Sequence, residues 1–63
     1  ESRADFIHKL GIVLKELKET RFLLKVIYRT KILASQDVES YIKECDELCA
    51  VIAKSIITAK AKK

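Results

Sequence analysis

The stretch DFIHKLGIVLKELKETRFLLKVI, residues 5–27, decides the fold of this 63-residue chain. It contains one glycine, Gly11, and no proline. Its apolar residues recur at alternating steps of four and three, which is the spacing of a helix that packs along a second helix. The predicted seam, with one polar interruption at Thr20, consists of Phe6, Leu10, Val13, Leu17, Thr20, Leu24 and Ile27.

The same helix carries apolar residues that lie off this seam. Ile12, Leu23 and Val26 widen the apolar surface to a second face. A helix with two apolar faces needs two sets of neighbours, and one partner helix covers only one of them. We therefore predict an oligomer or bundle interface that consists of Ile12, Leu23, Val26, Phe6, Leu10, Leu17 and Leu24.

The chain is expected to form two helices, over about residues 3–30 and about residues 36–60. Ser2 and Asp5 resemble a capping box for the first helix, and Ser35 is the expected N-cap of the second. The second helix has an apolar stripe of its own, made of Val38, Tyr41, Ile42, Cys45, Leu48, Cys49, Ile52 and Ile56. The fold class is all-α: residues 1–63 form a single antiparallel helical hairpin, which is half of an up-down four-helix bundle. The other half is supplied either in cis by further sequence or in trans by copies of the chain.

Catalysis, a cofactor, a metal and a small-molecule substrate are not expected from this sequence. Cys45 and Cys49 lie four residues apart on one helix face and are predicted to be small core residues. His8 is the only histidine, and neither helix has the Glu-x-x-His pattern of bundles that hold two metal ions. Ser55 and Thr58 have no histidine near them in sequence to act as a base. We therefore expect a protein that is not an enzyme.

Membrane insertion is not expected either, because no apolar run approaches the roughly 18 residues that a spanning helix needs. With no signal-peptide pattern at its start, the chain is expected to be cytoplasmic. It begins at Glu1 without a methionine, which we interpret as the mark of a fragment or a processed product.

Basic residues are the strongest remaining functional signal. The chain has 13 Lys and Arg against 9 Asp and Glu. A candidate nucleic-acid-binding stripe on the first helix, which we call the basic stripe, consists of Lys15, Lys18, Arg21, Lys25 and Arg29. Five acidic residues between Asp37 and Glu47 offer an alternative, since they can pair with the stripe within the chain or across a subunit boundary. A smaller cluster at the end of the chain consists of Lys60, Lys62 and Lys63, where the helix dipole alone favours lysine.

Three segments resemble a known family. SRADFIHKLGIVLKELKET, LLKVI and ELCAVIAKSIITAK are similar to the C-terminal half of the bacterial four-helix-bundle proteins encoded by intervening sequences of 23S ribosomal RNA. The motifs that carry the resemblance are Asp5-Phe6-Ile7, Leu10-Gly11-Ile12, Glu16-Leu17-Lys18-Glu19-Thr20 and Ser55-Ile56-Ile57-Thr58-Ala59-Lys60.

That resemblance implies that the chain holds the third and fourth helices of the bundle, since the family's first two helices have no counterpart here. It also implies a ring-like homopentamer and association with RNA or with a nucleic-acid enzyme. A structural or protein-binding scaffold without nucleic acid is the alternative, because most members of the family have no assigned biochemical role.

Overall fold

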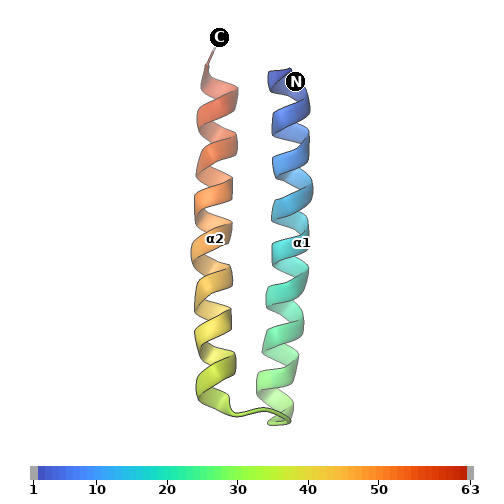
Figure 1. The fold of residues 1–63 in the computed structure, drawn as a ribbon, viewed down its shortest axis with the longest axis vertical. Coiled ribbons are helices and arrows are strands. Elements are labelled where there is room, and N and C mark those ends of the chain that lie inside the picture. Colours follow the sequence, from blue (N-terminus) through green and yellow to red (C-terminus); the bar gives the residue numbers. More distant parts are fainter. Residues whose placement is uncertain (1, 63) are drawn as a thin grey trace.

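The computed structural model describes residues 2–62, which form an antiparallel pair of helices (Figure 1). Helix α1 spans Arg3–Thr30 and helix α2 spans Ser35–Ala61. The two helices are joined by residues 31–34 at one end of the molecule, and the two termini lie together at the other end (Figure 1). The hairpin is a rod of 47 × 14 × 14 Å. The all-α hairpin predicted from the sequence is therefore confirmed.

Helix α1 begins at the cap predicted from the sequence. The Ser2 hydroxyl oxygen accepts a hydrogen bond from the Asp5 backbone N–H at 3.1 Å, and the Ser2 carbonyl accepts one from Phe6 at 3.0 Å. The helix ends at Lys31, whose φ of 57° places it in the left-handed region. A residue other than glycine in this region costs about 1–2 kcal/mol of conformational free energy. Interactions of the neighbouring residues therefore offset this cost in the turn.

Helix α2 begins without the predicted cap. Ser35 is its first helical residue, and Ala34 occupies the N-cap position, where no side chain accepts a hydrogen bond. The prediction of Ser35 as the cap was wrong by one residue. Because alanine has no side-chain acceptor, the first N–H groups of α2 lack the partner that α1 obtains from Ser2.

The seam between the helices follows a strict alternation of three and four residues in both. The least exposed positions of α1 in the seam are Ile7, Leu10, Leu14, Leu17, Arg21 and Leu24. Those of α2 are Val38, Ile42, Cys45, Cys49, Ile52, Ile56 and Ala59. Among residues 2–62, the buried hydrophobic residues are Val38, Cys45 and Cys49. The prediction that both cysteines are core residues is confirmed.

The seam of α1 differs from the predicted one at Phe6, Val13 and Thr20, whereas the predicted seam residues Leu10, Leu17, Leu24 and Ile27 are half-buried. Phe6 and Val13 are 45% and 44% exposed and lie beside the seam, as Thr20 does, whereas Ile7 and Leu14 lie within it. The two candidate lines differ by one residue, and both are apolar. The line that includes Ile7 and Leu14 faces α2. It also places Arg21 and Tyr28 next to acidic residues of α2, and these polar contacts distinguish it from the line that includes Phe6 and Val13.

The hairpin has two sides that differ in chemistry. In an antiparallel pair, equivalent flanking positions of the two helices share a side. The positions beside the seam on the first side, which we call the apolar side, are Phe6, Val13, Thr20 and Ile27 of α1 with Tyr41, Leu48 and Ser55 of α2. Those on the opposite side, which we call the charged side, include Lys18 and Lys25 of α1 with Glu39 and Asp46 of α2.

Candidate interaction surfaces

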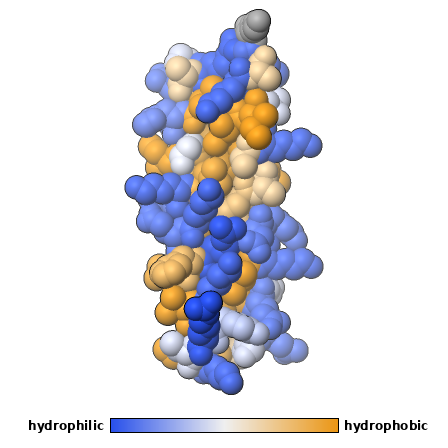
Figure 2. All heavy atoms as spheres, turned by 180° about the vertical axis from the view of Figure 1, so that it is seen from behind, coloured by the Kyte–Doolittle hydropathy of each residue, from blue (hydrophilic) through white to orange (hydrophobic). Residues whose placement is uncertain are grey.

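Many large apolar side chains of the hairpin are exposed to solvent. Among residues 2–62, thirteen large hydrophobic residues are exposed, and the most exposed of them are Ile32, Ile57, Phe22, Leu23 and Val51. Figure 2 shows one face, on which hydrophobic surface reaches solvent between hydrophilic side chains along the length of the hairpin. A compact protein of 7.2 kDa exposes about 4,100 Å², whereas this hairpin exposes 5115 Å². The hairpin therefore exposes more surface than a compact chain of its mass.

The predicted interface residues fall into two groups. Leu10, Leu17 and Leu24 are half-buried in the seam between α1 and α2. Ile12, Leu23 and Val26 are exposed, as is Phe6. The first group therefore holds the hairpin together, and the second group is available for contacts beyond it.

The basic stripe is divided by a contact across the hairpin. Lys15, Lys18, Lys25 and Arg29 are exposed. Arg21 instead lies in the seam, where its Nη1 donates a hydrogen bond to Oδ1 of Asp46 at 2.9 Å. This hydrogen bond raises the pKa of the Arg21 guanidinium above its ordinary value. Pairing of an acid of α2 with the stripe, one of the two alternatives drawn from the sequence, thus occurs within the chain at Arg21.

An open groove of about 620 Å³ runs along α1 beside two of the remaining residues of the basic stripe, Lys15 and Lys18, and the acidic Glu19 also lines it. Its walls include Lys15, Lys18 and Phe22, and Gly11 forms part of its floor. Phe22 is 65% exposed. Lysines that flank an exposed aromatic ring are the combination that binds phosphates and stacks on bases in single strands. Phe22 was not predicted from the sequence as a binding residue, because the apolar seam and the charged residues were considered separately.

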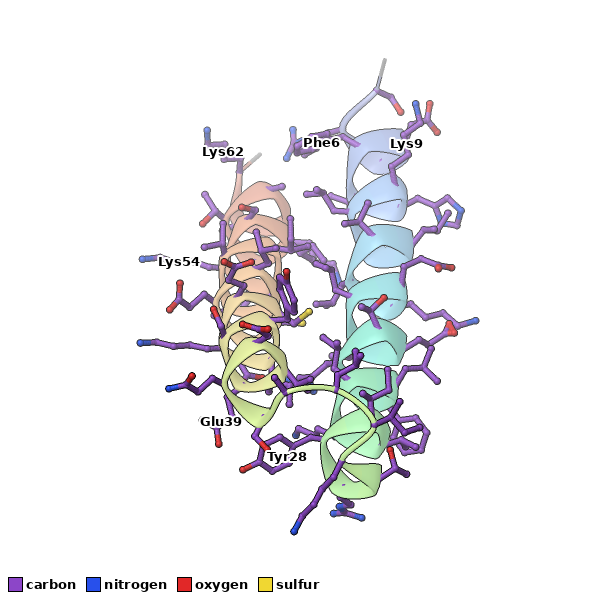
Figure 3. The ribbon with its side chains drawn as sticks, turned by 60° about the horizontal axis from the view of Figure 1, so that its bottom comes forward. Phe6, Lys9, Tyr28, Glu39, Lys54 and Lys62 are labelled. Carbon is purple, nitrogen blue, oxygen red and sulfur yellow. The ribbon has the colours of Figure 1, made fainter. Side chains whose placement is uncertain are left out.

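A second groove, of about 590 Å³, lies on the apolar side near the termini. It is lined by Phe6 of α1 and by Lys54 and Lys62 of α2, and the Lys54 side chain extends outward from α2 in Figure 3. The other lining residues are Arg3, Val51, Ser55, Thr58 and Ala59. Because its residues come from both ends of the chain, this cationic groove was not visible in the sequence. Lys63, which belonged to the predicted terminal basic cluster, lies outside the described residues.

A third groove, of about 360 Å³, lies on α2 nearer the loop. It is lined by Glu44, Glu47, Leu48 and Val51. Val51 therefore belongs to both the cationic and the acidic groove. The two grooves have apolar floors and opposite charge.

The loop end is closed by a hydrogen bond between α1 and α2. The Tyr28 hydroxyl donates to Oε1 of Glu39 at 2.6 Å, and the two side chains meet below the seam in Figure 3. This bond, and then the negative charge of Glu39, raises the pKa of Tyr28 above its ordinary value. The contact is polar, exposed and sensitive to high pH.

Residues 2–62 contain no cluster of three or more His, Cys, Asp and Glu residues that could hold a metal ion. Neither helix in this part of the chain combines the length and the apolarity that crossing a membrane requires. Comparison with known proteins found no matching family model, no matching curated protein and no matching solved structure. The functional argument therefore rests on the surfaces of the hairpin.

Proposed function

We propose that this chain is a non-enzymatic subunit of a helical bundle, which acts by self-association into an oligomer. The observation that carries the proposal is the imbalance between three buried and thirteen exposed large hydrophobic or cysteine side chains. A chain of this size gains little stability from one seam and normally needs additional helices, disulfides or metals. Both cysteines are free thiols, so additional helices are the remaining source.

The mass of the chain in solution tests this proposal. We expect sedimentation equilibrium to give a multiple of 7.2 kDa at micromolar concentration. Aspartate at Ile12 or Val26, which are exposed on α1, shows whether the outward face of α1 takes part. A helical chain that stays monomeric at all concentrations would contradict the proposed function.

Binding of nucleic acid through α1 is a second candidate, favoured by the groove that joins Lys15, Lys18 and Phe22. The three groups provide two phosphate contacts and one stacking surface in each subunit, and an oligomer repeats them. Because Arg21 forms a hydrogen bond with Asp46, four residues of the basic stripe remain available for this role.

A salt series with single-stranded and structured RNA tests the second candidate. Binding should weaken as salt rises, and Lys15→Glu with Lys18→Glu should lower both the affinity and the salt slope. Lys43→Glu, at an exposed position of α2, is the control with the same change of charge as either single substitution. If the double variant binds RNA as tightly as the unaltered chain, α1 does not contact phosphates.

The resemblance to the intervening-sequence proteins gives this proposal an alternative form, in which the bundle is completed in cis and not by a second copy of the hairpin. It favours a pentameric ring, a cytoplasmic location, two further helices in cis, and association with ribosomal RNA or a nucleic-acid enzyme. The mass measurement separates a pentamer from smaller oligomers, and the salt series separates RNA association from a purely structural scaffold.

A further inference from the structure

The two grooves on the apolar side are arranged about the middle of the hairpin. Arg21 lies level with Asp46, and Tyr28 lies level with Glu39, which defines the register of the two helices. In this register Val51 lies level with Glu16, close to the midpoint of α1. The cationic groove extends from Val51 towards the termini, and the acidic groove extends from Val51 towards the loop.

A half turn about an axis near Val51 exchanges the two ends of the hairpin. It brings the cationic groove of one copy, with Arg3, Lys54 and Lys62, onto the acidic groove of another, with Glu44 and Glu47. The same operation brings the second cationic groove onto the first copy's acidic groove. Both contacts are therefore satisfied at once, as a two-fold interface requires.

We infer that two copies of this chain pair in antiparallel orientation through their apolar sides to form a four-helix bundle. Val51 lies next to its counterpart at the two-fold axis. Phe6, Val13, Tyr41 and Leu48 fill the space between the hairpins, and the lysines and glutamates form ion pairs at its edge. This inference rests on the proposed bundle function and names its partner and its interface.

The exposed area agrees with a contact of this kind. The hairpin exposes 5115 Å², about 1,000 Å² more than a compact chain of its mass. A standard interface covers about 800 Å² on each partner. One dimer contact is therefore large enough to remove most of the surplus.

The charges select the antiparallel orientation over the parallel one. A two-fold axis along the rod would place the end with the termini of one copy beside the same end of the other. Arg3, Lys54 and Lys62 of both copies would then lie close together, and Glu44 and Glu47 would lie at the level of the partner's own acidic residues. Juxtaposed like charges disfavour such an arrangement.

Val51→Asp, with Ile57→Asp as its matched control, tests the interface. Val51 is 60% exposed and Ile57 is 68% exposed on the same helix, and neither holds the hairpin seam. Val51→Asp places two carboxylates together at the axis, so the dimer dissociation constant should rise about a hundredfold or more. Ile57→Asp, which points away from the apolar side, should leave it unchanged. Circular dichroism verifies that both variants remain helical.

A charge exchange tests the orientation. Lys54→Glu and Glu47→Lys should each weaken the dimer by roughly tenfold, and the two together in one chain should restore association. Val51→Cys should form a disulfide-linked dimer under mild oxidation, while the unaltered chain, whose two cysteines are buried, should not. Failure of both the exchange and the cross-link would overturn the antiparallel arrangement.

The outcomes distinguish this inference from the function on which it rests. If the chain is monomeric at every concentration, both are wrong. If it forms an oligomer that Val51→Asp leaves intact and Ile12→Asp or Val26→Asp dissociates, the bundle function stands and the interface is on the outward face of α1 instead. If it forms a dimer that Val51→Asp alone dissociates, the interface proposed here is correct.

Discussion

Tyr28 gives the hairpin a stability that depends on pH. Its hydroxyl donates to Glu39 across the loop end, and this bond raises the pKa of Tyr28. A raised acid pKa means that the bond stabilises the folded state below the ordinary tyrosine pKa of about 10. The stabilisation is lost as pH rises through the folded-state pKa of Tyr28.

A titration of tyrosinate absorbance measures this effect. In a Tyr41→Phe background the signal comes from Tyr28 alone. We expect Glu39→Gln to lower the pKa of Tyr28, because glutamine can still accept the hydrogen bond but carries no charge. An unchanged titration curve would mean that the 2.6 Å contact between the two side chains is not maintained in solution.

Arg21 shows how a single polar residue can occupy an apolar seam. Its guanidinium and the Asp46 carboxylate remain partly exposed, with side-chain exposures of 30% and 53%, and pairs of this kind add little stability. Arg21→Leu completes the apolar line of α1 and should raise the midpoint of thermal unfolding by a few degrees. A lower midpoint in a circular dichroism melt would show that the pair holds the hairpin more strongly than its exposure indicates.

The role of Arg21 was not predictable from its own helix. Spacing alone places it beside Lys18 and Lys25, which predicts that it belongs to the basic stripe. Its partner Asp46 lies 25 residues away, and only the register between the helices brings the two together. Cys45 and Cys49 were predictable as core residues. An i, i+4 pair on an apolar stripe faces the seam whatever the register between α1 and α2 is.

At the scale of the helices, Gly11 is the weakest point of α1. A methyl group added at Gly11 meets no atom within 4 Å, so alanine introduces no clash there. Gly11→Ala should therefore raise the free energy of unfolding by about 1 kcal/mol through its higher helix propensity. Urea denaturation of the two chains measures the difference, and a decrease would show that the groove above Gly11 is occupied by another helix.

The start of α2 is the second weak point. Ala34 occupies the N-cap position with an extended ψ of 126°, which suits a capping serine. Ala34→Ser should stabilise the chain by about 1 kcal/mol, since its hydroxyl oxygen can accept a bond from the first turn. Ser2→Ala, which removes the cap of α1, should have the opposite effect of similar size. If urea denaturation shows no gain for Ala34→Ser, the loop holds position 34 in a geometry that excludes capping.

The helices themselves were predictable nearly to the residue, and the face that each one buries was predictable only in part. The predicted bounds of about 3–30 and 36–60 compare with Arg3–Thr30 and Ser35–Ala61. On α1, however, the lines through Phe6 and through Ile7 are both apolar, because one faces α2 and the other lies on the apolar side. A chain built to contact more than one neighbour carries more apolar residues than one seam needs, so periodicity alone cannot rank its faces.

At the scale of the whole molecule, the hairpin is more extended than a compact chain of its length, so we expect association to add to the stability that its own seam provides. Its radius of gyration is 14.5 Å, whereas a compact chain of this length has about 10.6 Å. If folding is completed by association, the free energy of unfolding depends on the chain concentration, and each tenfold rise in concentration adds about 1.4 kcal/mol per mole of dimer.

The midpoint of thermal unfolding should therefore rise with concentration in the unaltered chain and in Ile57→Asp. In Val51→Asp it should be lower and independent of concentration, because the isolated hairpin then unfolds as a single chain. A midpoint that does not move with concentration in the unaltered chain would show that one seam with three buried side chains is sufficient to hold α1 and α2 together.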